Sequence, residues 1–235
     1  MGRGTIRSPS LKEIAMWEYR GVKGRTKTPP DIVGNYEGNI LLLIAGSSCV
    51  FDDLATFLDC KPDKHLYGNL RKWSMTEGQH VMTINDITSY VECHVHHAAS
   101  LHADNMKHWI GLRKNHPMQE GRPMIHGNQQ SGVLDVEWAL ENSGALSGFF
   151  GATIGVAMGY EQVIMAGNPI DCSARFFDPP LRECAYGKEA PLLAWRMNAQ
   201  RNPEMMSRIR SLSGNTKTLL GEPELNGYAH QTANA

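Results

Sequence analysis

The sequence has no CxxC pair, no long apolar run and no excess of charge of either sign. Its five cysteines are an odd number, which favours reduced thiols and predicts no disulfide. The longest apolar runs, 40–45 and 163–166, are far shorter than the roughly 20 residues of a membrane span. The first ten residues lack the apolar core of a signal peptide. We therefore expect a cytoplasmic protein without a membrane partner.

Positive and negative charges nearly cancel, with 23 Lys and Arg against 24 Asp and Glu and a net charge of −1. Without net positive charge the chain has no global attraction to nucleic acid, so nucleic acid is not an expected partner. Hydrophobic residues make up 41% of the 235 positions and charged residues 20%, which excludes disorder of the whole chain. This length suits one α/β domain with extended arms.

Three parts are predicted along the chain. Residues 1–38 form an arm with a short helix over 11–19, because the basic segment 21–30 carries two glycines and two prolines and cannot hold a helix or a central strand. The arm either lies on the surface or binds a phosphate or a partner. Residues 39–221 form the packed domain, and residues 222–235 form a polar tail.

Solid apolar runs alternate with helical patterns in the packed domain. The runs that predict strands are 40–45, 80–84, 98–101, 124–126, 162–166 and 208–212. The patterns that predict helices are 50–58, 103–114, 147–158, 192–200, 203–207 and 216–220, whereas 133–140 fits either state. Strands that are apolar on both faces are typical of a parallel sheet covered on both sides. The sequence therefore predicts an α/β fold with a mostly parallel sheet between two helix layers, and leaves the strand order open.

Small or polar residues follow each predicted strand. Because ligands of open parallel sheets bind at the carboxyl ends of the strands, we expect these residues to converge on one cleft. They are Gly46, Ser47, Ser48, Asn85, Asp86, Ser100, His102, Gly167, Asn168, Asp171, Ser211, Ser213, Gly214 and Thr216.

Glycine turns at three predicted helix starts are candidate ligand contacts. The turn 46–48 either binds an anion through backbone N–H groups or is an ordinary turn with a serine cap. Segment 143–148 offers a second set of N–H donors, or small residues for close packing. In the last segment we expect Gly214 to adopt a positive φ and Asn215 or Thr216 to cap the following helix, so that this segment closes one side of the site. Arg210 there either contacts a ligand phosphate or lies on the surface.

A histidine cluster is the second candidate site. In an extended segment His94 and His96 share one face, and with His102 or Asp104 they could bind zinc or iron; a retained metal would make His94, His96 and His97 the ligands. The alternative is that these are loop and strand histidines with satisfied hydrogen bonds. Because the spacing matches no recognised ligand set, we predict no structural metal.

Three side chains are candidates for catalysis. His102 is the preferred general acid or base, because it stands at a predicted strand end, and Asp86 is the second. Cys49, on the first helical turn, is either a nucleophile with a lowered thiol pKa or a structural cysteine.

A family resemblance rests on the order of five segments. They are IAGSSCVFDDL, TIND, HHAASLHADNMKHW, SGALSGFFGATIGVAMGYEQVIMAGNPID and RIRSLSGNTKTLLG. Over roughly residues 39–221 the chain resembles uncharacterised Rossmann-like proteins of bacteriophages and prophages. More distantly it resembles sialyltransferase-like and pterin-diphosphokinase-like proteins, whose first glycine loop and later strand end contact a nucleotide. The resemblance implies a Rossmann-like fold and ligand contacts at Gly46, Ser47, Ser48, Asn85, Asp86, Gly167, Asn168 and Asp171.

The resemblance implies that the protein binds a nucleotide or nucleotide sugar and transfers a glycosyl or phosphoryl group. The loop here reads Gly-Ser-Ser-Cys where sialyltransferases carry G-x-G-P-S, and Pro169 stands beside the expected acid, so binding is supported more directly than transfer. The alternatives are a non-catalytic protein that sequesters a nucleotide, and a structural or assembly component of a phage particle. A phage-encoded protein would act in the host cytoplasm, and self-association is left open.

Overall fold

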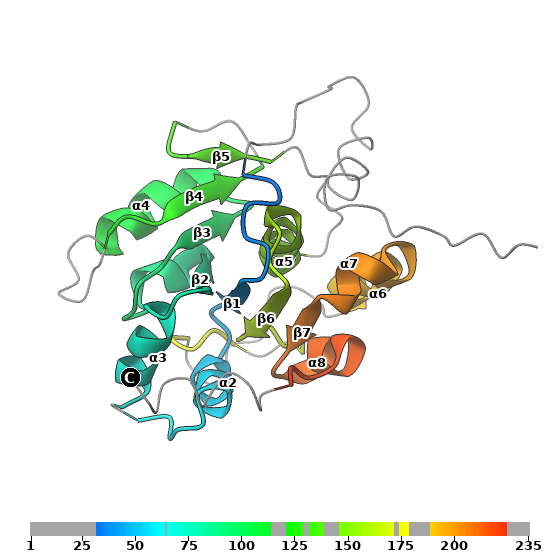
Figure 1. The fold of residues 1–235 in the computed structure, drawn as a ribbon, viewed down its shortest axis with the longest axis horizontal. Coiled ribbons are helices and arrows are strands. Elements are labelled where there is room, and N and C mark those ends of the chain that lie inside the picture. Colours follow the sequence, from blue (N-terminus) through cyan, green and yellow to red (C-terminus); the bar gives the residue numbers. More distant parts are fainter. Residues whose placement is uncertain are drawn as a thin grey trace, which may run out of the picture.

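The computed structural model of the protein describes residues 32–63, 65–113, 121–128, 132–138, 146–171, 174–178 and 189–224. They form a seven-stranded, fully parallel sheet with helices on both faces (Figure 1), which confirms the predicted Rossmann-like α/β class. The helix predicted over 11–19 and the basic segment 21–30 lie outside the described residues. No helix in the described part of the chain is long and apolar enough to cross a membrane.

The strand order places a topological switch at the centre of the sheet. The strands are β1 (Ile40–Ile44), β2 (Gln79–Ile84), β3 (His97–Ser100), β4 (Met124–Gly127), β5 (Val136–Glu137), β6 (Gln162–Ala166) and β7 (Ile209–Ser211). Their order is β5-β4-β3-β2-β1-β6-β7. The chain thus builds outward from β1 to β5 and then returns to place β6 on the other side of β1. In open α/β sheets such a switch is where ligands bind.

The helices match the predicted segments closely, with two additions. They are α2 (Val50–Phe57), α3 (His65–Ser74), the 3-10 helix η1 (Asn85–Ser89), α4 (Ala103–Arg113), α5 (Leu146–Met158), α6 (Glu189–Arg201), α7 (Pro203–Ser207) and α8 (Gly214–Leu220). Neither α3 nor η1 is predicted from the sequence. Helix α3 buries Leu66, Leu70 and Trp73, spaced i, i+4, i+7, but Gly68 and Asn69 in its middle weaken the local helical signal.

The continuous apolar run of β1 is explained by two separate cores. Leu42 and Ile44 pack with α2 and α3 on one face of the sheet. Leu41 and Leu43 pack with α5 on the other face. All four side chains are fully buried, so none of these four positions is available for an exposed polar residue.

Helix α5 lies unusually close to the sheet because its glycines face the strands. A Cβ at Gly151 would lie 2.4 Å from Ile84 Cδ1, and one at Gly155 would lie 2.7 Å from Leu41 Cδ2. The predicted alternative of close packing through small residues is therefore correct for this helix. It brings the amino end of α5 against the carboxyl edge of the sheet, near the switch.

The segment 32–38, which the sequence analysis assigns to the arm, packs against the core. Val33 is buried, and Gly34 donates a backbone hydrogen bond to Ala157 O (3.1 Å). The ring of Tyr36 stacks on that of Tyr160, with centroids 4.8 Å apart and 9° between the planes. Residues 32–38 therefore pack against the domain predicted over 39–221.

Candidate functional site

The two strands beside the switch bring their carboxyl-end loops into contact. Ala45 N donates to Ala166 O at 2.9 Å, and Ser47 N donates to Gly167 O at 3.2 Å. The parallel register of β1 and β6 thus carries the predicted segments 46–48 and 167–168 out of the sheet side by side.

Asp53 joins three of the loops at this edge. Its Oδ2 accepts hydrogen bonds from Gly167 N (2.7 Å) and Ser213 Oγ (2.7 Å), which follow β6 and β7. Gly167 has φ +67°, and a Cβ there would lie 2.2 Å from Ala45 O, so only glycine fits. Burial raises the pKa of the Asp53 carboxyl, and the hydrogen bonds from Gly167 and Ser213 oppose that shift.

Cys49 belongs to this same cluster and is a structural cysteine. Its Sγ lies 3.3 Å from Ser213 Oγ and 3.7 Å from Asp53 Oδ2. Burial raises the pKa of the Cys49 thiol to about 11, and the charge of Asp53 adds to the rise. The predicted lowering of this pKa at a helix start is therefore wrong, and the group is a thiol at neutral pH.

Residues 214–216, at the start of α8, form hydrogen bonds with the loop after β6. Gly214 has the expected positive φ of 64°. Thr216 Oγ1 donates to Asn168 O at 2.6 Å, and Asn215 N donates to Pro169 O at 2.8 Å. Both residues lie inside α8, so the prediction that they cap this helix is wrong; they hold the β6 loop instead.

Residues 174–178, named here the strap, cross the end of β1. Ser48 N donates to Ala174 O (2.8 Å), Phe176 N donates to Gly46 O (3.1 Å), and Ser47 forms an antiparallel bridge with Arg175. The backbone amides of Ser47 and Ser48 are therefore already bonded within the protein. The prediction that they form a free anion-binding turn does not hold in this conformation.

The strap also contacts Asp86, one of the two predicted catalytic residues. Arg175 Nη1 donates to Asp86 Oδ2 at 2.5 Å, and the Asp86 side chain is only 14% exposed. A Cβ at Gly46 would lie 3.5 Å from Asp86 Oδ1, so this carboxylate borders the loop after β1. To act as an acid or base, Asp86 would first have to separate from Arg175.

His102, the other predicted catalytic residue, lies farther along the edge. Its backbone N donates to Ser100 Oγ (2.8 Å), and Ser100 Oγ donates to Asn85 Oδ1 (2.7 Å). Its exposed side chain follows β3, two strands from β1, or roughly 10 Å at the usual strand spacing. Exposed Asp171 follows β6 on the other side. The predicted residues thus form a row along one edge, with Gly46–Ser48 and Gly167–Asn168 at its centre.

Arg210, one of the predicted alternatives for a phosphate contact, forms a hydrogen bond with the backbone of its own strand. Its Nη1 donates to Ile209 O at 2.9 Å. The guanidinium also lies near Gly221 beyond α8, where a Cβ would approach Arg210 Nε to 4.0 Å. The surface reading of this arginine therefore fits the structure better than a ligand contact.

The amino end of α5 flanks the switch from the face opposite α2. A Cβ at Gly148 would lie 2.5 Å from Asn168 Nδ2, so the Asn168 carboxamide lies on the first turn of this helix. Asn168 Nδ2 is buried and has no hydrogen-bond partner among the described residues. A helix amino end carries unpaired N–H groups and a partial positive charge. Two sets of hydrogen-bond donors, Asn168 Nδ2 and the backbone N–H groups at the amino end of α5, therefore lie next to each other at the end of β6.

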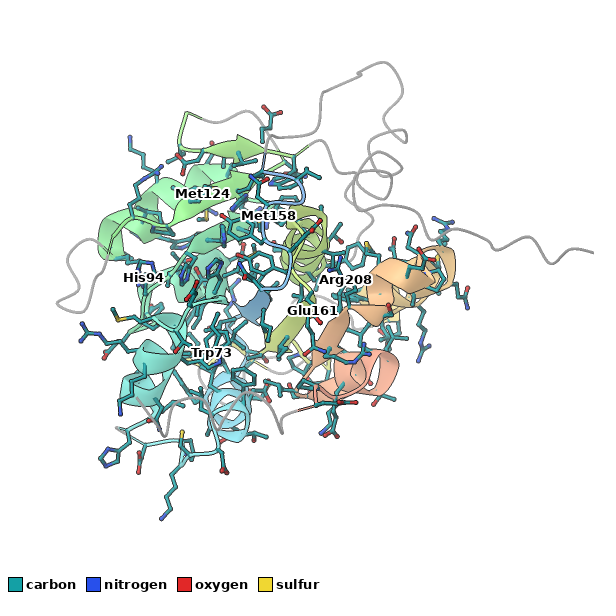
Figure 2. The ribbon with its side chains drawn as sticks, in the orientation of Figure 1. Trp73, His94, Met124, Met158, Glu161 and Arg208 are labelled. Carbon is teal, nitrogen blue, oxygen red and sulfur yellow. The ribbon has the colours of Figure 1, made fainter. Side chains whose placement is uncertain are left out.

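The histidines form a hydrogen-bonded network that runs across the sheet, from His80 near the amino end of β2 to His126 and Trp138 near the carboxyl ends of β4 and β5. Trp138 Nε1 donates to His126 Nδ1 (3.0 Å), and His126 Nε2 lies 3.0 Å from His97 Nδ1. Tyr160 Oη lies 2.8 Å from His97 Nε2 and 2.6 Å from His80 Nδ1. Figure 2 labels the nearby His94, whose ring lies edge-on to that of His96 with the centroids 4.4 Å apart. The hydrogen-bonded alternative is thus confirmed for His97. We name this set the Trp138–His80 network.

Proton positions in the network follow from its first member. Indole N–H can only donate, so His126 Nδ1 accepts and its proton is on Nε2. His97 then accepts at Nδ1 and donates from Nε2 to Tyr160, whose hydroxyl donates to His80 Nδ1. Burial lowers the pKa of His126 to about 4 and that of His97 well below its ordinary value, which keeps both rings neutral. Among the described residues no group of three or more His, Cys, Asp or Glu could hold a metal ion.

Two parts of the carboxyl edge, Asp53 and the strap, are not predicted from the sequence. Asp53 follows an equally acidic Asp52, and nothing in the local pattern says which of the two is buried. The strap lies in an irregular region without periodicity, so its contacts with Gly46 and Asp86 leave no sequence signal.

Comparison with protein-family models, curated proteins and solved structures finds no match for this chain. The resemblance to phage proteins, and the functions that it implies, therefore remain predictions.

Proposed function

We propose that the carboxyl edge of the sheet, at the switch between β1 and β6, binds a nucleotide or nucleotide sugar. One observation carries the proposal: Asn168 Nδ2, which has no hydrogen-bond partner in the described part of the chain, lies on the first turn of α5 at the topological switch. An anion placed there would receive hydrogen bonds from the carboxamide and from the helix amino end. The phosphate group of the ligand is therefore assigned to Asn168 and α5, and not to the amides of Ser47 and Ser48.

The remaining polar groups suit the rest of such a ligand. The Ser48 side chain is exposed beside the switch, and Asn85 and Asp86 follow the adjacent strand β2. These hydroxyl, amide and carboxylate groups match the donors and acceptors of a ribose or a base. Extension of the ligand toward β3 would bring a transferable glycosyl or phosphoryl group to His102, the proposed acid or base.

Binding is tested by adding a panel of nucleotides, nucleotide sugars, sugar phosphates and inorganic phosphate and measuring the melting temperature, followed by calorimetry on any ligand found. Asn168→Asp keeps the size of the side chain but places a negative charge beside the phosphate. We expect it to weaken binding by at least about tenfold. Asn69→Asp on α3 makes the same chemical change away from the edge and should bind like wild type. No stabilisation by any compound, or unchanged affinity in Asn168→Asp, would refute the site.

Catalysis is tested separately on the ligand that binds. A glycosyl or phosphoryl transferase would consume it in the presence of an acceptor or water, whereas a sequestering protein would return it unchanged. If His102 acts as acid or base, His102→Ala should lower turnover at least about a hundredfold with little change in affinity. A bound ligand that is never consumed would leave nucleotide binding as the function and remove the role of His102.

A further inference from the structure

An aromatic cluster lies directly beside the proposed nucleotide site. Phe176 of the strap borders Gly46, where a Cβ would approach its ring to 3.8 Å. Its ring packs edge-on against Phe51 of α2 (5.4 Å), Tyr90 after η1 (5.1 Å) and Phe177 (5.0 Å). Phe176 and Phe51 are partly buried and belong to the packing of α2.

Two rings of this cluster are largely exposed and stack on each other. Tyr90 is 44% and Phe177 43% exposed, and the centroids are 5.6 Å apart with 20° between the planes. Single exposed apolar residues are ordinary on protein surfaces. Two near-parallel rings packed against a third, beside a set of ligand-binding groups, instead leave an exposed aromatic face on which one further ring can stack.

Arg175 gives this surface a positive group. Its guanidinium carbon lies 5.7 Å from the Phe177 centroid, and its ion pair with Asp86 uses Nη1. A guanidinium has five N–H donors, so this pair leaves capacity for ribose or phosphate oxygens. A ligand that matches both features carries a flat ring at one end and oxygen-rich or anionic groups next to it.

We infer that Tyr90 and Phe177 form the stacking surface for the base of the bound nucleotide, with Arg175 contacting its ribose or phosphate oxygens. The inference rests on the proposed function and sharpens it, because a sugar phosphate has no flat base to stack on these rings. The base would lie at the end of β2 and the phosphate at the end of β6, on either side of the loop after β1. Stacking a base on an aromatic side chain is worth roughly tenfold or more in affinity.

The test compares a nucleoside monophosphate with ribose 5-phosphate, which differs only by lacking the base. Wild type should bind the nucleotide at least about tenfold more tightly. Phe177→Leu and Tyr90→Leu, which keep apolar bulk but remove the flat ring, should each lose most of that preference while affinity for ribose 5-phosphate is unchanged. Tyr90 lies outside the strap, so its variant tests the surface even if Phe177→Leu disturbs the strap. Leu193→Ala, an exposed apolar change on α6, is the matched control.

Three results would overturn the inference, and they separate it from the proposed function. Equal binding of both compounds, weakened alike by Asn168→Asp, would remove the base surface and keep the phosphate site. No binding of either compound, or of any other nucleotide or nucleotide sugar, would remove both. A stable dimer in light scattering that Phe177→Leu dissociates, without any nucleotide effect, would assign the rings to contact between two copies of this protein.

Discussion

The hydroxyl of Tyr160 is the link on which the Trp138–His80 network depends, and its removal in Tyr160→Phe should destabilise the protein strongly. The hydroxyl accepts from His97 Nε2 and donates to His80 Nδ1, at 2.8 Å and 2.6 Å. His97 is 2% exposed, so no water replaces the lost partner, whereas half-buried His80 has access to water. An unsatisfied buried polar group costs about 1–3 kcal/mol. With a smaller contribution from His80, we expect the free energy of unfolding to fall by about 2–4 kcal/mol.

Tyr36→Phe is the matched control for this experiment. Tyr36 stacks on Tyr160, but its hydroxyl makes no hydrogen bond to any described residue. Its removal should change stability by less than about 0.5 kcal/mol. The assay is urea unfolding at pH 7, followed by far-UV circular dichroism and tryptophan fluorescence. Equal effects of the two substitutions would refute the stabilising role assigned to the Tyr160 hydroxyl in the network.

The remaining predictions concern pH and two residues of the carboxyl edge. Burial lowers the pKa values of His97 and His126, so below about pH 6.5 the folded state binds fewer protons than the unfolded state. The free energy of unfolding should therefore fall with pH. Each histidine should cost about 1.4 kcal/mol of stability per pH unit between about pH 6.5 and 4. An unfolding free energy that is the same at pH 7 and pH 5 would contradict this. Gly167→Ala should destabilise by more than about 3 kcal/mol, because its Cβ would meet Ala45 O at 2.2 Å; a melting temperature near wild type would show that the loop rearranges. Asp53→Ala leaves Gly167 N and Ser213 Oγ without their acceptor, so the free energy of unfolding measured by chemical denaturation should fall by about 2–5 kcal/mol. The control is Asp52→Ala, on the exposed side of the same turn, which should lower it by less than about 1 kcal/mol.

The sequence predicts the strands of the sheet better than the contacts made by the loops at their carboxyl ends. β1 and β6 have apolar side chains on both faces, a pattern typical of a covered parallel strand, so fold class and strand positions could be predicted locally. The contacts of Gly46 and Ser48 could not, because their partners lie more than a hundred residues away in the strap, which has no periodic pattern. For the same reason the histidine segment 93–97 predicts hydrogen-bonded histidines, but not that Trp138 orders their protons.

The central position of β1 also has a consequence for synthesis and folding. Its neighbour β2 follows shortly after it, but its other neighbour is β6, where Leu42 pairs with Ile164. At the usual translation rate of about 5–20 residues per second, β6 is synthesised roughly 6–25 seconds after β1, and until then that edge of β1 is unpaired. During that interval an apolar strand presents unpaired N–H and C=O groups, the condition under which nascent strands aggregate or bind chaperones. Fragments that end before residue 160 should therefore be insoluble, however well their own strands and helices form.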